Sequence, residues 1–414
     1  MRASAFPVYY GWMVLAASAL CEMLVMGATS YAAGLFVLPL QAEFQVSRAA
    51  ASSAILILFL GAAIAAPFIG RLLDRHPIRL VMCGGAIVLG LSLSAIALSP
   101  SLLVMALLLM FPAAFAFMAV GPLTTSTLAS RWFYRRRGLA LGIAAVATSG
   151  GGFIVVPLLS EAIQRFGWRQ GLMLEAAVLV VVLFLLGFFV LRDSPASEGL
   201  DDHPENHGRA LAEAPAAARK LPLKDILFSR AFWIPSLTLA AISGTCQATV
   251  VTLIPYGRQL GFAPATVALL VSVFAVSAGV TKVGAGLLAD HLNRRALLVI
   301  AALCMTCSWL VVSISAEYAA LVTCAGLAGV GLGFALPTVG ALIAGHFGAP
   351  SFGTVMGWTY VLVLLFAILA VLFAASVFDR TGSYVPAFQS FAGLLGGLLL
   401  LNLLMPPFRQ SLMP

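Results

Sequence analysis

The chain alternates between long apolar runs and short polar breaks. Twelve of these runs are bounded by charged residues or by proline and glycine turns, and each holds about 20 residues or more. A helix of about 20 residues crosses a hydrocarbon core of about 30 Å. The pattern therefore predicts an all-α integral membrane protein whose helices cross the bilayer at 11–38, 49–71, 79–98, 102–129, 138–161, 170–191, 232–256, 266–289, 296–315, 318–344, 354–378 and 385–406.

Composition agrees with a membrane protein. The chain is 62% hydrophobic and 9% charged, with a mean hydropathy of +1.06, whereas soluble domains carry about 25% charged residues. The net charge of +8 is spread over loops and does not indicate a nucleic-acid partner. The six cysteines lie in apolar runs, and the Cys304-x-x-Cys307 pair has no second pair beside it, so neither a disulfide framework nor a metal site is expected.

Positive charges are distributed unevenly between the two sides of the predicted membrane. Of the 23 lysines and arginines, 17 lie at the termini or on the loops that join spans two to three, four to five, six to seven, eight to nine and ten to eleven. Five lie on the opposite side. Because cytoplasmic loops are enriched in lysine and arginine, we expect both termini to be cytoplasmic in a bacterial-type inner (plasma) membrane. The first 40 residues are expected to form the first span rather than a signal peptide.

The longest polar segment, 193–230, falls between spans six and seven and is rich in alanine, proline and acidic residues. It predicts a flexible cytoplasmic linker, with a short surface helix at 223–229, between an N-terminal six-helix bundle at 1–192 and a C-terminal one at 231–414. His203 and His207 lie in the linker without further clustered ligands, so we expect no metal site there.

The two halves repeat each other. Gly70 and Asp74 recur as Gly286 and Asp290 at an offset of 216 residues. An offset of 215 or 216 also relates Pro39 to Pro255, Pro122 to Pro337, and Gly138 and Gly142 to Gly353 and Gly357. Repeats of this kind predict two pseudo-symmetric bundles with a binding site between them near mid-depth.

One charge lies deep inside the eighth span. Lys282 is about 24 Å from Thr266 and about 12 Å from Asp290 along a helix that rises about 1.5 Å per residue. Charges at such depth cost several kcal/mol and usually face a cavity or a partner. Small residues at 275, 278, 279, 285 and 286 surround it and permit close packing or leave room for a ligand. We expect Lys282 to bind an anion, the alternative being a fixed ion pair with a structural carboxylate.

The turn after the second span reads Gly70-Arg71-Leu72-Leu73-Asp74-Arg75-His76-Pro77-Ile78-Arg79. It resembles the G-x-L-x-D-R-x-G-R-[RK] signature of the major facilitator superfamily, with Pro77 where that family usually has glycine. A degenerate second copy follows the eighth span at 290–295, and the resemblance covers nearly the whole chain. We expect the charges of both copies and of the fourth span's end to stabilise one closed state on the cytoplasmic side: Asp74, Arg75, Arg79, Asp290, Arg294 and Arg131.

A second set of motifs narrows the resemblance. The run Arg131-Trp132-Phe133-Tyr134-Arg135-Arg136-Arg137-Gly138-Leu139-Ala140-Leu141-Gly142, the Tyr10-Gly11-Trp12 that begins span one, and the segment at 379–384 together look like the monocarboxylate porter branch. That branch includes monocarboxylate–proton symporters and oxalate:formate-type exchangers. From the residues alone, the G-x-x-x-G at the end of the run predicts close packing of span five on a neighbour, for which we expect span eight. The glycines at 150–152 predict a flexible point in span five.

The resemblance assigns roles to single residues. Lys282 occupies the place of the branch's span-eight arginine, which holds the substrate carboxylate, and Tyr31 matches its span-one tyrosine. Lysine keeps the charge but lacks the bidentate fork of arginine. The symporters' span-one lysine is Leu35 here and their span-eight aspartate is Ala278, while the exchangers' basic residue in span eleven is absent. A single cation favours a monoanion over a dianion as the substrate. The lysine and aspartate that couple proton transport in the symporters are both missing here.

Glu22, about 17 Å into the first span, can supply the missing proton site. It either binds a proton or pairs with the deep lysine until substrate arrives, the alternative being a protonated structural acid. Tyr31 is nine residues further, about 180° around a regular helix, so the two share a cavity only if the span bends, for which Gly27 is the candidate. Glu175 in span six is expected to be structural. Further residues expected to face the cavity are Tyr360, Trp358, Gln247 and 124–127.

No motif indicates catalysis. The glycines at 329–333 mimic a nucleotide-binding loop but lie inside an apolar run, and the chain has no HExxH, GxSxG or P-loop motif. We predict a secondary transporter of a small organic anion, a monocarboxylate, that works as a monomer by alternating access without a cofactor. Proton symport and anion exchange stay open as the driving process. Lys282, Tyr31 and Tyr360 would bind the substrate, and Glu22 the proton.

Two other functions stay open. A multidrug or metabolite exporter of the same fold would take neutral or cationic ligands, and Glu22 would then be its key charge. A non-transporting membrane sensor would need a signalling domain, for which the linker is too short.

Overall fold

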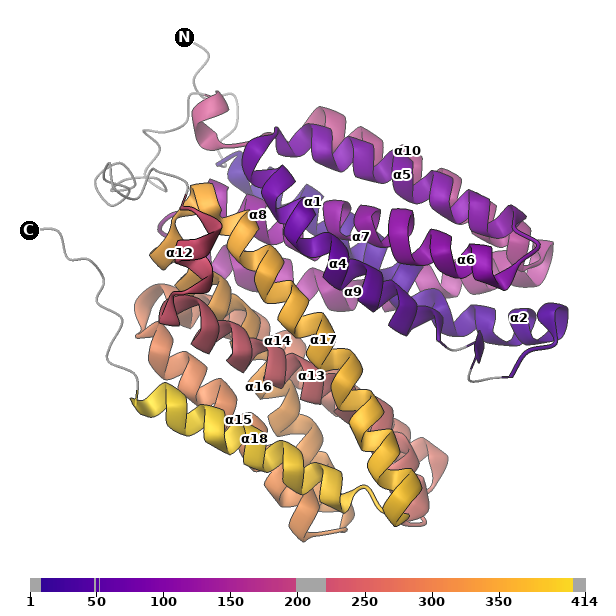
Figure 1. Ribbon diagram of the computed structural model, residues 1–414, viewed down its shortest axis with the longest axis vertical. Helices are drawn as coiled ribbons and strands as arrows, with labels where there is room; N and C mark the ends of the chain where they lie inside the picture. The colour runs from indigo at the N-terminus through magenta and orange to yellow at the C-terminus, as the bar shows by residue number, and fades with distance from the viewer. Residues whose placement is uncertain (1–8, 48–49, 52, 199–220, 405–414) are drawn as a thin grey trace, which may run out of the picture. The chain divides into compact units, whose positions relative to one another are not determined.

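The computed structural model describes residues 9–47, 50–51, 53–198 and 221–404, and within these ranges every regular element is helical (Figure 1). The elements before residue 199 are α1 (Gly11–Met26), η1 (Gly27–Tyr31), η2 (Ala32–Phe36), α2 (Val37–Phe44), α4 (Ala54–Arg75), α5 (Ile78–Leu98), α6 (Leu102–Leu108), η3 (Leu109–Ala113), α7 (Ala114–Val120), α8 (Pro122–Trp132), α9 (Arg137–Phe166), α10 (Trp168–Leu185), η4 (Leu186–Val190) and η5 (Pro195–Glu198). Those after residue 220 are α12 (Leu223–Leu227), α13 (Arg230–Gln259), α14 (Pro264–His291), α15 (Arg294–Ile314), α16 (Tyr318–Phe347), η7 (Ala349–Ser351), α17 (Phe352–Thr381) and α18 (Val385–Leu404).

The predicted spans are confirmed. The described residues contain 12 helices or helix runs that are long and apolar enough to cross a membrane. Their ends differ from the predicted ones by at most six residues, and the largest difference is in the first span, which continues to Phe44. The chain is therefore a multi-pass membrane protein.

Local chemistry fixes where several helices begin and end. The Asp193 carboxylate accepts a hydrogen bond from the Ile78 amide at 2.5 Å and so caps α5. The Asn293 side chain accepts from the Arg295 amide at 2.9 Å at the start of α15. Gly167 separates α9 from α10 with φ of 83°, a conformation that glycine adopts without strain.

The first span is irregular. After α1 the chain winds as a π-helix through η1 and as a 3₁₀-helix through η2 before α2 resumes α-helical geometry. The change begins at Gly27, the residue that the sequence offered as the place for a bend if the span has one. A Cβ on Gly27 would lie 2.6 Å from Val155 Cβ and 2.8 Å from the Gly151 carbonyl oxygen on α9. The glycines at 150–152 thus permit close packing of α1 on α9, which is one continuous helix, and a flexible point there stays a prediction.

The chain divides into two compact units. The first consists of Met1–Arg135, Ala144–Leu211 and Ala349–Trp358, and the second of Arg136–Ile143, Ala212–Gly348 and Thr359–Pro414. The predicted boundaries at 192 and 231 stay a prediction, because the segment between them lies mostly outside the described residues, as do His203 and His207. Its short helix, predicted at 223–229, is present as α12.

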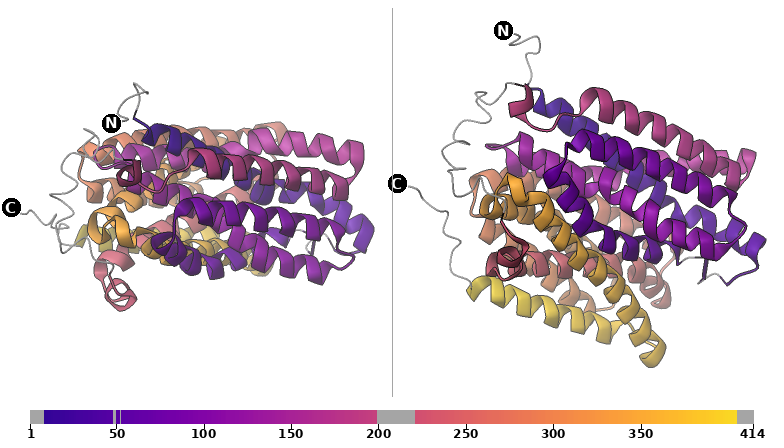
Figure 2. Two further views of the ribbon diagram at one scale, coloured as in Figure 1. Left: turned by 90° about the horizontal axis from the view of Figure 1, so that it is seen from above. Right: turned by 45° about the horizontal axis from the view of Figure 1, so that its top comes forward.

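Each unit has its own helix packing. In the first, α5 packs along α10 and against α7, and α1 packs against α8. In the second, α14 and α15 both pack along α16, and α18 packs on α15. Figure 1 shows α5 beside α10 and α15 beside α18, and Figure 2 shows the helices of each unit running in a common direction.

Two tight helix crossings use the glycines of the repeat. In the first unit a Cβ on Gly70 of α4 would collide with the Gly353 carbonyl oxygen of α17, and a Cβ on Gly357 would lie 2.5 Å from the Ala66 oxygen. In the second unit a Cβ on Gly286 of α14 would lie 2.6 Å from the Gly138 oxygen of α9. The predicted packing of span five on span eight is confirmed, and the repeat relates the two crossings to each other.

Candidate functional site

Lys282 lies on the buried face of α14. Its side chain is 4% exposed, whereas Val280, two residues earlier on the opposite face, is 70% exposed. Ala278 and Ala285 on the lysine's face are also buried. Beside this face, a Cβ added to Gly279 would meet no described atom within 4 Å. The helix thus directs Lys282 away from its exposed face. Open space adjoins Gly279, one turn before the lysine.

The second unit supplies no acid at the depth of Lys282. Between residues 230 and 404 the acidic residues are Asp290, Glu317 and Asp379, each at the end of a span. The Lys282 ammonium lies within electrostatic range of the Cys246 thiol on α13, which is itself buried. A permanent carboxylate clamp from the helices of its own unit is therefore excluded by the sequence of those helices.

Tyr360 lies on α17 in the same unit and is buried. The preceding residue, Thr359, shares a hydrogen bond of 2.8 Å with the Ser236 hydroxyl of α13. This bond fixes the rotation of α17 at Tyr360. The role of Tyr360 in substrate binding stays a prediction.

Glu22 and Tyr31 of the first span differ in burial. Glu22 is 1% exposed, and one turn before it the Ser18 carbonyl accepts a hydrogen bond of 3.2 Å from Thr125 of α8. Tyr31 is 45% exposed, and its ring lies 3.5 Å from the position of a Cβ on Gly152. That both side chains face one cavity stays a prediction.

Asp74 caps the start of α17. Its carboxylate accepts hydrogen bonds from the Gly353 amide at 3.0 Å and from both the amide and the hydroxyl of Thr354 at 2.7 Å. Arg131 Nη2 lies 3.7 Å from Asp74 Oδ1 and donates to the Leu73 carbonyl at 2.7 Å. One carboxylate thus joins α4, α8 and α17, with its charge at the positive end of a helix dipole.

The other predicted gating residues lie apart from this cap. Arg79 stacks over the Phe188 ring at 4.0 Å, and Arg75 is exposed at the end of α4. Arg294 donates to the carbonyls of Ala289 and Ala341, at 3.3 and 3.1 Å, at the corresponding end of α14. The Asp290 side chain lies outside the described part. The structure therefore brings Asp74 and Arg131 together, whereas Arg75 and Arg79 lie at helix ends of the first unit and Arg294 lies in the second unit.

Two motifs that are far apart in the sequence form one aromatic cluster. The Tyr9 hydroxyl donates to the Trp132 carbonyl at 2.6 Å, and the Trp12 ring lies 4.6 Å from the Phe133 ring. Tyr10 donates to the Val190 carbonyl at 2.8 Å, and burial raises the pKa of its phenol, which keeps it a donor. The cluster anchors the ends of α1, α8 and η4 to one another, a contact that the sequence did not predict.

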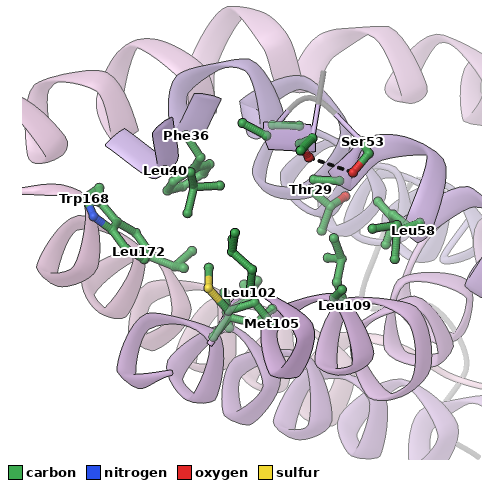
Figure 3. A pocket seen from close by; sticks show the side chains of 18 of the residues that line it. Thr29, Phe36, Leu40, Ser53, Leu58, Leu102, Met105, Leu109, Trp168 and Leu172 are labelled. Carbon is green, nitrogen blue, oxygen red and sulfur yellow. Dashed lines mark hydrogen bonds between the residues drawn. The ribbon is translucent and has the colours of Figure 1, made fainter. Parts of the chain in front are cut away.

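The sequence also did not predict a cavity of about 360 Å³ in the first unit (Figure 3). Its walls come from η1, η2, α2, α4, α5, α6 and α10, and the labelled apolar side chains point into it, among them Phe36, Leu58, Met105 and Leu172. Near its rim, at the start of α10, Arg169 binds Glu43 at 2.6 Å. The sequence carries no pattern that predicts this cavity. The cavity forms where the second half of the first span departs from α-helical winding.

The family assignment comes from comparison with known proteins. A family model described as Major Facilitator Superfamily matches residues 18–263 and 246–411. Monocarboxylate transporter 11 of Mus musculus is 29% identical over 322 residues, which cover 74% of this chain and 68% of that protein. The oxalate:formate antiporter of Oxalobacter formigenes is 25% identical over 285 residues, which cover 68% of this chain and 64% of that protein. The match to an uncharacterized MFS-type transporter of Bacillus subtilis, 26% identical, spans 39% of this chain and 40% of that one.

Solved structures show the same fold. The proton:xylose symporter XylE superposes with a TM-score of 0.76 over 97% of both chains at 15% identity. The human organic anion transporter MFSD10 superposes with a TM-score of 0.72 over 95% of this chain and 99% of that chain at 18% identity. The sequence motifs, the twelve spans, the family model and these superpositions agree, and this chain is a transporter of the Major Facilitator Superfamily.

Proposed function

We propose that this protein is a secondary transporter of a small organic monoanion, a monocarboxylate, that works by alternating access. The observation that carries the proposal is the buried Lys282, the one deep charge of its half of the chain, with no acid of that half at its depth. An ammonium group so placed stabilises an incoming carboxylate strongly, because the surroundings exclude water. The names of two relatives, a monocarboxylate transporter and an oxalate:formate antiporter, point to small organic acids as substrates.

The charge count favours a monoanion. One ammonium neutralises one carboxylate, whereas a dianion such as oxalate would keep a net negative charge in a medium of low dielectric constant, at a cost of several kcal/mol. Tyr31 and Tyr360 are proposed to contribute hydroxyl donors to the substrate. Glu22, buried in the first span, is proposed as the group that takes up a proton with the substrate.

The cap on α17 is proposed to hold one closed state. Asp74 can hold the start of α17 only while its three hydrogen bonds are formed, so this contact breaks if the end of α4 separates from α17. Charged residues at helix ends are proposed to support the same gate: Arg131, Arg75, Arg79, Asp290 and Arg294. The positive charge of these loops supports an orientation with both termini in the cytoplasm.

Substitution of the buried lysine tests the proposal. Purified protein in proteoliposomes should take up radiolabelled short monocarboxylates, and Lys282→Ala should abolish that uptake. Lys282→Arg, which keeps the charge, should retain part of it. Lys224→Ala on the exposed face of α12 is the matched control and should transport like the wild type. Uptake by Lys282→Ala with unchanged affinity would refute the assignment.

A thermal-shift panel separates the competing function. Stabilisation of the wild type by short carboxylates, lost in Lys282→Ala, supports the proposal. Stabilisation by neutral or cationic compounds alone, lost in Glu22→Gln, would assign the protein to exporters of such compounds.

A further inference from the structure

The sixth span carries a carboxyl group for which the proposed function has no role. Glu175 of α10 is 9% exposed, and neither carboxyl oxygen has a hydrogen-bond partner among the described residues. An ionised carboxylate that is taken out of water without a partner costs several kcal/mol. Glu175 therefore carries its proton in this conformation.

The groups around Glu175 do not change that conclusion. The helices packed against α10 bring few titratable or charged side chains: Cys83 and Arg79 on α5, Cys21 and Glu22 on α1, Glu161 and Arg165 near the end of α9, and Glu43 on α2. Arg79 stacks on Phe188, Arg165 binds Glu161 at 2.6 Å, and Arg169 of α10 itself binds Glu43. None of the described cations forms an ion pair with Glu175.

Glu175 lies about one helical turn from the cavity of the first unit. It follows Leu172, which lines the cavity, by three positions, so the two share a face and are about 4.5 Å apart along the axis. On the facing helix, Leu93 lines the cavity, and a Cβ on Gly90, one turn deeper, would lie 3.3 Å from the Ala176 carbonyl oxygen. The packed helices α5 and α10 thus both contribute to the cavity wall, and Glu175 lies one turn beyond it on α10.

We propose that Glu175 is a second proton-binding site of this transporter, reached through the cavity from the side on which α10 begins. The Thr29 and Ser53 hydroxyls in the cavity wall each donate to a backbone carbonyl, and their oxygens are left to accept from entering water. A proton moves from water to a carboxylate oxygen and returns to water in the reverse step, so no other reactant is needed.

Proton loss at Glu175 is linked to a change of conformation. Ionisation of Glu175 costs little free energy only in a conformation in which water reaches the carboxylate. Proton binding therefore favours the closed α5–α10 interface, and proton release favours the opened one. A proton gradient across the membrane then biases the transport cycle. The inference rests on the proposed function only for the identity of the transported anion.

The test compares two replacements of Glu175 with an exposed acid. Glu175→Gln keeps the shape, and Glu175→Met removes all polar atoms and so avoids a folding defect from an unpartnered amide. Both should accumulate less labelled monocarboxylate than the wild type under the same pH gradient, because only the Glu22 proton is then coupled, while counterflow without a gradient continues. Glu161→Gln, on an exposed ion pair, is the control and should accumulate like the wild type. Gradient-driven accumulation by both Glu175 variants at the wild-type level would overturn the inference and leave the proposed function standing.

An infrared measurement tests the protonation of Glu175 separately from the transport of carboxylates. In infrared spectra of the purified protein at neutral pH, Glu175→Gln should remove a protonated-carboxyl C=O band that is present in the wild type. If the wild type transports no carboxylate, the proposed function fails, and this band still decides the inference: an unchanged band overturns it.

Discussion

Loss of the Asp74 carboxylate should open the start of α17 by a measurable amount. The cap consists of three hydrogen bonds of 2.7 to 3.0 Å from one carboxylate to Gly353 and Thr354. In Asp74→Asn the carbonyl oxygen can keep the two bonds to Thr354, but the amide then faces the Gly353 N–H with a donor. Loss of one charge-assisted bond costs about 1.5–3 kcal/mol, and a lost N-cap typically costs about 1 kcal/mol.

A central value of about 2 kcal/mol corresponds to about a 30-fold change in an equilibrium constant, at about 1.36 kcal/mol per factor of ten. Because local opening governs the exchange of such amides, the amides of Gly353 and Thr354 should exchange about 30-fold faster in Asp74→Asn. Hydrogen–deuterium exchange with mass spectrometry on peptides covering 349–358 measures this directly.

The control removes a smaller part of the cap. Thr354→Val deletes the hydroxyl donor but keeps both backbone donors, so it should cost about 1 kcal/mol and speed exchange about fivefold. Exchange in Asp74→Asn that matches the wild type would show that Asp74 does not hold α17, and the gate argued from this cap would be wrong. Exchange that rises equally throughout α17 would indicate global destabilisation instead of a lost cap.

Four further substitutions test the packing. Gly286→Val should prevent stable folding, since its Cβ would lie 2.6 Å from a carbonyl oxygen of α9, whereas Gly284→Ala, which meets no described atom within 4 Å, should keep or raise the melting temperature. Arg169→Gln removes a half-exposed ion pair worth about 0–1 kcal/mol and the bonds that Arg169 donates to the carbonyls of residues 97 and 99, so amide hydrogen exchange in the segment around them should rise by only a few fold. Glu175→Met replaces a buried, unpartnered polar group and should stabilise the protein by about 1–3 kcal/mol in thermal unfolding; a lower melting temperature would show that the carboxyl group is hydrogen-bonded.

The helices could be predicted because their cause is local. A run of about 20 apolar residues must satisfy its backbone groups internally in lipid, and only a helix does so within one segment. The error at the first span has a specific reason. The sequence placed its end at residue 38, before a polar stretch, but the helix continues because Glu43 is bound by Arg169 and by the Trp168 indole at 2.8 Å.

The glycine crossings were predictable for another reason. Gly142 and Gly286 leave no room for any side chain where α9 meets α14, and a requirement for glycine at fixed spacing is visible in a sequence. The cavity, the aromatic cluster and the winding of η1 are different, because they depend on which helices meet and at what angle. Side chains such as Phe36 and Leu172 are equally compatible with lipid, core or cavity wall, so their sequence positions carry no signal.

The deep charges of the two halves differ in sign, and this difference constrains the transport cycle. The second half holds one cation, Lys282, and the first half holds two buried acids, Glu22 and Glu175. With both acids protonated and a monoanion on the lysine, these groups have no net charge, whereas after release of the monoanion and both protons they carry one negative charge. Moving a unit charge through the membrane field is worth about 2.3 kcal/mol per 100 mV, so the membrane potential acts on the empty carrier and leaves the loaded one nearly unaffected. On these charges, the proposed substrate and the proposed protons require each other: a neutral loaded state exists only when a monoanion is bound and the acids keep their protons.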